Sequence, residues 1–181
     1  GLMAATFDRK RVVELLTELD QRLEAAGVTA DLYIVGGAAM ALAFDRERLT
    51  RDIDAVFLPK RAVLDEIDAM TRLHDDLAEG WMNDAVKGFL APRQDVAATA
   101  LSVGTHLRVL VASPERLLAM KVYAARVERD SDDILTLCRE LKVTNITQVL
   151  AIADEQYGKL LPAASKFITI ELLQDHLPMT A

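Results

Sequence analysis

Apolar positions recur at helical spacing in two segments of the N-terminal half, and each pattern predicts an amphipathic helix. In residues 7–27 the apolar set is Val12, Val13, Leu15, Leu16, Leu19, Leu23 and Ala26, and Gly27 ends the pattern. Residues 60–78 repeat the pattern with Val63, Ile67, Met70 and Leu73. Between these helices the apolar run from Leu32 to Val35 is short and uninterrupted, which is typical of a buried strand.

Two further apolar runs, residues 95–103 and 106–112, are separated by Gly104-Thr105 and predict strands joined by a hairpin or a tight link. Ser113-Pro114-Glu115 then starts a helix, because Ser caps the first turn, Pro fits the first position and an acid favours the N-terminus. We therefore expect an α/β (α+β) fold. Residues 1–112 would form a core built on a small mixed sheet. Residues 113–181 would form a helical portion that packs on this core or completes a single domain with it.

The stretch from Tyr33 to Phe57 carries the first candidate chemistry. Its strand breaks at Gly36-Gly37 and turns into a helix of small residues. Paired glycines before a helix let backbone N–H groups approach a phosphate at the positive end of the helix dipole. The same pair also occurs in ordinary tight turns, so it is not specific by itself. The basic residues Arg46 and Arg48 follow in a charged loop, where we expect them to be solvated.

Thr50-Arg-Asp52-Ile-Asp54 opens the next strand. Because side chains alternate along a strand, the two aspartates share one face, roughly 7 Å apart along the backbone. Two carboxylates at the start of a buried strand repel each other and resist desolvation, so they need a cation. Mg²⁺ or Mn²⁺ suits such oxygen ligands. A phosphate cradle beside a carboxylate-held metal indicates phosphoryl or nucleotidyl transfer from a nucleoside triphosphate.

These motifs also carry a resemblance. Gly36-Gly37, a gap of twelve residues and Thr50-x-Asp52-x-Asp54 resemble the signature of the polymerase-β-like nucleotidyltransferase superfamily. Two later stretches are similar to its AbiEii/MenT-like branch, the toxins of bacterial toxin–antitoxin systems: Trp81-Met-Asn-Asp84, and Ser113 to Lys121 with Arg126, Asp130 and Asp133. The resemblance spans residues 31–138.

The resemblance implies roles for individual residues. Gly36, Gly37 and Thr50 would bind the nucleotide, and Asp52 and Asp54 would hold the metal. Lys121 would face the triphosphate, while Asp84, or else Asp95, would stand in for the third carboxylate that the superfamily usually carries. The acceptor would be the 3′ end of a tRNA, and a cognate antitoxin would be a partner.

The residues around Lys121 leave two roles open. A lysine within an apolar helix face is costly to bury without a partner, so Lys121 should reach a carboxylate or a phosphate. Asp130 and Asp133 are three residues apart and share a helix face. They can hold Lys121 and Arg126 in position, or one of them can act at the active site.

Other functions remain compatible with the motifs. The same chemistry can act on a small acceptor, such as an aminoglycoside-type antibiotic, or on a protein hydroxyl. A degenerate nucleotidyltransferase fold without a third acid can also serve as a non-catalytic binding module.

The net charge and the single cysteine limit the binding partners and the cellular compartment that the sequence suggests. The net charge of −7 argues against a protein that coats nucleic acid non-specifically. Basic residues nevertheless gather in one span: His106, Arg108, Arg116, Lys121, Arg126 and Arg129. Cys138 is the only cysteine, which excludes an intrachain disulfide and favours the reducing cytoplasm. The longest uncharged run, Leu32 to Phe44, is too short to cross a membrane.

Overall fold

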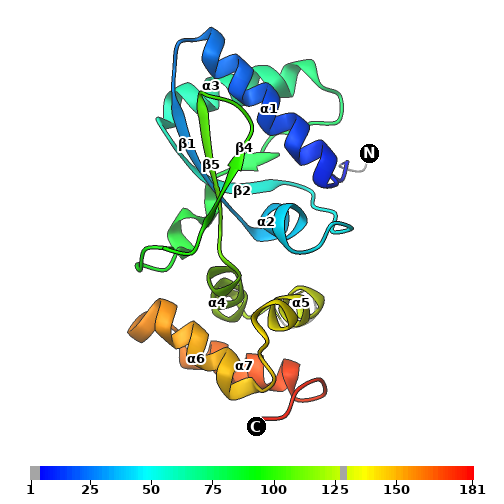
Figure 1. Cartoon of the computed structure of the whole chain (residues 1–181), viewed down its shortest axis with the longest axis vertical. Coiled ribbons are helices and arrows are strands. Elements are labelled where there is room, and N and C mark those ends of the chain that lie inside the picture. Colours follow the sequence, from blue (N-terminus) through cyan, green and yellow to red (C-terminus); the bar gives the residue numbers. More distant parts are fainter. Residues whose placement is uncertain (1–4, 127–129) are drawn as a thin grey trace. The chain divides into compact units, whose positions relative to one another are not determined.

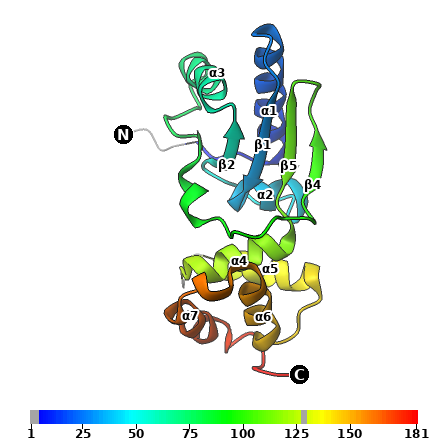
Figure 2. The same ribbon diagram turned by 90° about the vertical axis from the view of Figure 1, so that its left-hand side faces the viewer.

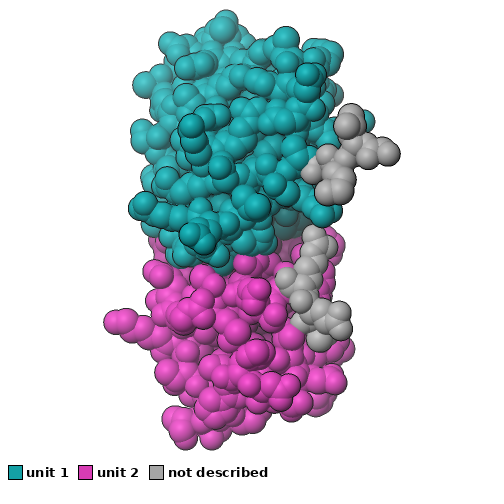
Figure 3. Space-filling view, turned by 90° about the vertical axis from the view of Figure 1, so that its right-hand side faces the viewer, with its two compact units in different colours: residues 1–88, 98–112 teal, residues 89–97, 113–181 magenta. Residues whose placement is uncertain are grey.

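The computed structural model describes residues 5–126 and 130–181. The chain forms two compact units, coloured separately in Figure 3. Unit 1 comprises residues 1–88 and 98–112, and unit 2 comprises residues 89–97 and 113–181. The described residues contain no helix that is both long and apolar enough to cross a membrane.

Unit 1 is a mixed sheet with three helices, as the apolar pattern predicts. Its elements are α1 (Arg9–Ala25), β1 (Ala30–Val35), α2 (Gly36–Ala43), β2 (Ile53–Leu58), α3 (Lys60–Leu73), β3 (Met82–Asn83), β4 (Thr99–Ser102) and β5 (Leu107–Val111). The strand order is β3-β2-β1-β5-β4. β1 runs antiparallel to β2 and parallel to β5, β2 runs parallel to β3, and β4 and β5 form an antiparallel pair. The predicted α/β class is therefore confirmed.

The two faces of this sheet differ in burial. Helices α1 and α2 lie on one face, behind the sheet in the view of Figure 2, and α3 packs against α1 and β2. Residues on this covered face, such as Ile34, Ile53 and Val109, are at most 3% exposed. On the opposite, uncovered face Leu58 is 66% exposed and Leu110 is 45% exposed. Apolar burial against the helices therefore fixes the register of each strand, because a slip by one residue would turn its core side chains outward.

A buried carboxylate on α1 holds the turn between β4 and β5. Asp20 is 4% exposed, and its Oδ1 accepts hydrogen bonds from the backbone N–H groups of His106 (2.7 Å) and Leu107 (2.8 Å). A Cβ atom at residue 104 would overlap this carboxylate, so the turn requires Gly104. The Gly104-Thr105 link predicted from the sequence is thus anchored by a long-range polar contact.

Unit 2 is helical and is built around α4, shown in green in Figure 1. Its elements are α4 (Pro114–Ala124), α5 (Ser131–Leu141), α6 (Ile146–Tyr157), a short 3-10 turn (Gly158–Leu160) and α7 (Ala163–Leu173). Ser113 caps α4 by accepting a hydrogen bond from the N–H of Arg116, as expected from the Ser-Pro-Glu start. α4 contacts each of the other three helices.

Residues 89–97 belong to unit 2 because polar contacts tie them to α4 and α6. Arg116 is only 3% exposed; its guanidinium donates to the backbone carbonyl of Arg93 and to Gln156 Oε1 (2.8 Å). The hydroxyl of Tyr157 donates to the carbonyl of Phe89 at 2.7 Å. The guanidinium of Arg116 is therefore buried and hydrogen-bonded inside unit 2, and it does not contribute to an exposed basic patch.

Candidate active site

The Gly-Gly turn lies where β1 passes into α2. α2 begins at Gly36, whose φ of +67° lies in the left-handed region that favours glycine. The first N–H groups of a helix have no partner within it and point outward from its N-terminus. In α2 no side chain caps these groups, since Val35 stands at the capping position. This end of α2 thus presents backbone donors of the kind that bind phosphate.

Both glycines also make room for neighbouring functional groups. A Cβ atom on Gly36 would stand 2.9 Å from Asp54 Oδ2. A Cβ atom on Gly37 would stand 2.8 Å from Thr50 Oγ1 and 3.1 Å from Arg48 Nη2. The turn is therefore in contact distance of a carboxylate, a hydroxyl and a guanidinium, and it brings together Gly36, Gly37, Thr50 and Asp54.

Asp52 and Asp54 lie on the uncovered side of the sheet. Asp54 belongs to β2 and is the register partner of Val35, the last residue of β1. Ile53, between the two aspartates, is fully buried on the covered face, whereas both carboxylates are half-buried. The expected common face of the pair is what this alternation produces. Asp54 is thus beside the Gly-Gly turn, and Asp52 directly precedes the strand that carries it.

Thr50 fixes the loop that leads to these carboxylates. Its backbone forms two hydrogen bonds with that of Phe7 (2.7 and 3.0 Å), and its hydroxyl donates to the carbonyl of Asp52 at 2.8 Å. Thr50 is 7% exposed. The hydroxyl therefore orients the backbone at Asp52, and its oxygen retains the capacity to accept a hydrogen bond.

Arg48 is a site residue that the sequence analysis assigned to solvent. It is half-buried, and its guanidinium reaches the turn at Gly37 and donates to the carbonyl of Leu49. A guanidinium beside exposed backbone donors adds a second group suited to phosphate. The only sequence signal for this position is its place two residues before Thr50.

The two candidates for a third carboxylate have different positions: Asp84 directly follows Asn83, the register partner of Asp54 on β3, whereas Asp95 belongs to unit 2. Asp84 Oδ2 is 3.0 Å from Lys60 Nζ, and this hydrogen bond lowers the pKa of Asp84. Asp95 belongs to unit 2 and accepts a hydrogen bond from the N–H of Ser113 (2.9 Å). Within residues 5–126 and 130–181 no three His, Cys, Asp or Glu side chains are grouped so as to hold a metal. Asp84 therefore stands next to the strand position that pairs with Asp54, and its carboxylate is held by Lys60.

Trp81 and Asn83 form the contacts of the chain segment that leads to Asp84. The Trp81 ring is 2% exposed and its Nε1 donates to Thr71 Oγ1 (2.9 Å). The Asn83 side chain bonds the backbone of Gly80 and Ala85. Asn83 therefore stabilises the backbone of the turn after α3, and the Trp81 ring packs in the core beside it.

In unit 2, Lys121 is paired with carboxylates, as expected for a lysine within an apolar helix face. Its Nζ lies 2.8 Å from Asp130 Oδ1 and 3.1 Å from Asp133 Oδ2, and all three side chains are at most 11% exposed. Arg126 Nε lies 3.7 Å from Asp130 Oδ2 and is half exposed. Asp130 and Asp133 thus hold Lys121, which is one of the two roles left open above. Arg129, also expected in a basic patch, lies outside the described residues.

The carboxylate pair fits a divalent metal. Gly36 leaves Asp54 the space in which a side chain would otherwise stand, and the donors are hard carboxylate oxygens. Mg²⁺ is commonly bound by one or two carboxylates, with substrate phosphates and waters as its remaining ligands. Asp52 and Asp54 beside a phosphate cradle meet this requirement without a third acid.

Comparison with known proteins agrees with this geometry. A protein family described as "nucleotidyltransferase of unknown function (DUF6036)" matches residues 10–162. The chain belongs to this family. The match includes the Gly-Gly turn, both aspartates and the Lys121 cluster, so all of these lie within the part of the chain that defines membership.

A solved structure has the same fold. It is that of an antigenic nucleotidyltransferase-like protein from Paracoccidioides brasiliensis, with a TM-score of 0.51 and 17% sequence identity over 95% of this chain and 91% of the other. At this identity the likeness shows the fold alone. No curated protein matches the sequence.

Proposed function

We propose that this member of the family is a nucleotidyltransferase that uses Mg²⁺ or Mn²⁺ to transfer NMP from a nucleoside triphosphate to an acceptor hydroxyl. The observation that carries the proposal is the position of Asp54 Oδ2, which lies 2.9 Å from the point at which a Cβ atom on Gly36 would stand. Phosphate-binding donors and a metal-binding acid are the two parts of such a site, and here they are neighbours. Family membership supports the same chemistry.

The residues of unit 1 have complementary tasks in this reaction. The triphosphate lies against the N–H groups of the Gly-Gly turn, with Arg48 and the Thr50 hydroxyl beside it. Asp52 and Asp54 hold the metal, which when bound would polarise the α-phosphate and stabilise the leaving pyrophosphate. The acceptor oxygen forms a bond to the α-phosphorus while the bond from that phosphorus to the β-phosphate oxygen breaks. Pyrophosphate leaves with the electron pair, and the hydroxyl proton passes to a carboxylate oxygen and on to water.

Lys121 has a proposed role that depends on its two partners. By resemblance to the AbiEii/MenT-like branch it would face the triphosphate. Asp130 and Asp133 hold its ammonium in one place, at 2.8 and 3.1 Å, so the group is preorganised and does not have to be ordered by substrate. Arg126, which is more exposed, adds a second cation to the same cluster.

The same resemblance supplies the acceptor and the biological role. The acceptor is the 3′ end of a tRNA, the transfer is toxic to the cell, and a cognate antitoxin protein restrains it. The Lys121-to-Asp133 spacing supports this branch.

The test is transfer by the purified full chain. It is incubated with each α-labelled nucleoside triphosphate, Mg²⁺ and total RNA, and both labelled RNA and released pyrophosphate are measured. We expect release that requires Mg²⁺, stops with a chelator, and is lost in Asp52→Asn and Asp54→Asn while both variants remain folded. Undiminished transfer by either variant would overturn the assignment of the metal site. Label on RNA identifies the acceptor, and gel analysis of tRNA resolves its 3′ end.

A further inference from the structure

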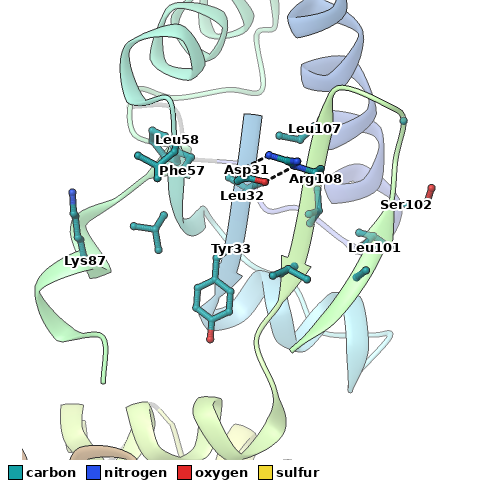
Figure 4. A pocket seen from close by; sticks show the side chains of 15 residues that line it. Asp31, Leu32, Tyr33, Phe57, Leu58, Lys87, Leu101, Ser102, Leu107 and Arg108 are labelled. Atoms are coloured by element: carbon teal, nitrogen blue, oxygen red, sulfur yellow. Dashed lines mark hydrogen bonds and ion pairs between the residues drawn. The ribbon is translucent and has the colours of Figure 1, made fainter. Parts of the chain in front are cut away.

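The uncovered face of the sheet in unit 1 contains a hollow of about 880 Å³. We call it the sheet hollow; its floor and rim include Tyr33, Val56, Leu58, Lys87, Arg108 and Leu110. Figure 4 shows Tyr33 on β1 at one end of the drawn residues, with Leu58 and Lys87 on one side and Arg108 on β5 on the other. Every lining residue belongs to unit 1, so the sheet hollow is a feature of that unit alone.

Strand register connects the sheet hollow to the carboxylate pair. Val56 is the register partner of Tyr33, which is in turn the partner of Leu110. Asp54 stands two residues before Val56 on β2 and therefore on the same face, about 7 Å further along the strand. The floor of the sheet hollow thus leads directly to the carboxylate that borders the Gly-Gly turn.

In-line transfer places donor and acceptor on opposite sides of the reacting phosphorus. The Gly-Gly turn follows the last residue of β1, so a triphosphate bound there lies beyond the end of the strand. The sheet hollow extends from the carboxylates in the other direction, back along β1 and β2. It is therefore on the acceptor side of the site.

The chemistry of the lining selects among acceptors. Its middle row consists of Val56, Tyr33 and Leu110, an aromatic ring on which a nucleobase can stack, with an apolar side chain on either side. Its charged groups are Asp31, Lys87 and Arg108, and Asp31 is already bound by Arg108 through two hydrogen bonds of 2.6 and 2.9 Å. One positive charge remains, on Lys87. Such a lining suits a phosphate-linked chain and offers no unpaired carboxylate to a polycationic antibiotic.

We infer that the sheet hollow binds the acceptor, as the unpaired terminal nucleotides of an RNA. The last base stacks on Tyr33 beside Leu110, Lys87 lies near the phosphates, and the terminal hydroxyl reaches the carboxylate pair. This inference rests on the proposed nucleotidyl transfer, since it assigns the acceptor side of that same site. Leu58, two-thirds exposed at the rim, has no place in the transfer chemistry and can be changed to probe the surface.

The experiment compares charge at Leu58 with charge at a matched position. Leu58→Asp and Leu58→Lys are prepared together with Leu73→Asp and Leu73→Lys. Leu73 ends α3, is 65% exposed against 66% for Leu58, and does not line the sheet hollow. Binding of a short single-stranded RNA and of Mg²⁺ with a nucleoside triphosphate is measured for each full-length variant. A 4-thiouridine at the RNA 3′ end maps the bound position by photo-crosslinking.

We expect Leu58→Asp to weaken RNA binding at least tenfold, Leu58→Lys to preserve or strengthen it, and both Leu73 variants to bind as the unchanged protein does. Crosslinks should fall on residues 31–33, 56–58 or 107–110. Crosslinks elsewhere, equal effects at Leu58 and Leu73, or absence of RNA binding would overturn the inference. So would an aminoglycoside that is modified in a way that depends on Leu58.

Nucleotide binding separates this inference from the proposed function. If Mg²⁺-dependent nucleotide binding and pyrophosphate release persist while the RNA crosslinks outside the sheet hollow, the acceptor surface is wrong and the transfer chemistry stands. If RNA crosslinks to the sheet hollow but no nucleotide binds, the RNA surface stands and nucleotidyl transfer is wrong.

Discussion

The carboxylate oxygen of Asp54 lies 2.9 Å from the point at which a Cβ atom on Gly36 would stand. The space between the Gly-Gly turn and the carboxylate on β2 is therefore too small for a methyl group. Because Gly36 also has a φ of +67°, a side chain there would face both backbone strain and a collision with the carboxylate. Gly36 therefore allows both the left-handed backbone of the turn and the close approach of the Asp54 carboxylate.

Gly36→Ala should therefore cost both stability and activity. Left-handed backbone at a residue with a Cβ costs roughly 1–2 kcal/mol, and the displaced Asp54 should reduce nucleotide transfer at least tenfold. Stability is measured by urea unfolding and transfer by pyrophosphate release.

Gly27→Ala is the matched control. Gly27 has a similar φ of +69°, and nothing lies within 4 Å of its Cβ position. It should lose a comparable free energy of unfolding and retain full transfer. Equal activity of the two variants would mean that the position of Asp54 is not critical for transfer.

The parts of this site that the sequence predicts are those that depend on neighbouring residues alone. Strand alternation alone places Asp52 and Asp54 on one face, and the glycines alone predict the turn between β1 and α2. The approach of Arg48 to Gly37 is different, because it depends on how the loop between α2 and β2 folds back, which no periodicity encodes. The same holds for Asp84, whose bond to Lys60 joins residues 24 positions apart.

The Lys121 cluster yields a second prediction. Lys121→Met would leave Asp130 and Asp133, 5% and 7% exposed, without their shared cation. An uncompensated buried charge costs about 3–5 kcal/mol, so we expect a loss of about 3 kcal/mol in the free energy of unfolding at pH 7.

Lys166→Met provides the comparison in the same unit. Lys166 forms a 2.8 Å ion pair with Asp154, but both side chains are more than one-third exposed. Surface pairs contribute at most about 1 kcal/mol. If Lys121→Met is as mild as Lys166→Met and only nucleotide affinity falls, the role of Lys121 is in substrate binding alone.

A third prediction concerns pH. The guanidinium of Arg11 on α1 bonds both oxygens of Asp76 (2.8 and 2.9 Å), and this contact lowers the pKa of Asp76. A carboxyl group with a lowered pKa stabilises the fold above its unfolded pKa of about 3.9, and this contribution disappears as the pH falls through the folded value. Because both side chains are partly exposed, the effect should be at most about 1 kcal/mol.

The check is a comparison of Arg11→Ala with the unchanged protein in thermal unfolding. The difference in Tm should be largest at pH 7 and should shrink as the pH is lowered below about 3.9. A difference that stays constant over this range would show that Arg11 stabilises the fold through packing of its alkyl chain and not through its charge.

Asp20 shows how a polar residue inside an apolar pattern can be mistaken for a solvated one. It follows Leu19 in the α1 sequence and carries no local signal of burial, yet it holds the turn before β5 from 86 residues away. That turn precedes Leu107 and Arg108, and so it sets the edge of the sheet hollow.

Asp20→Ala should therefore be strongly destabilising. It leaves the N–H groups of His106 and Leu107 without their acceptor, and each unsatisfied buried group costs about 1–3 kcal/mol. We expect a loss of about 3 kcal/mol in urea unfolding. Asp20→Asn keeps an oxygen at the same place and should recover most of it, while Glu24→Ala, an exposed acid on the same helix, should change stability by less than about 0.5 kcal/mol. Amide hydrogen exchange at His106 and Leu107 gives the local readout. Their protection should fall in Asp20→Ala beyond the loss in global stability, because the two hydrogen bonds to Asp20 are removed; unchanged protection would mean that the turn forms without it.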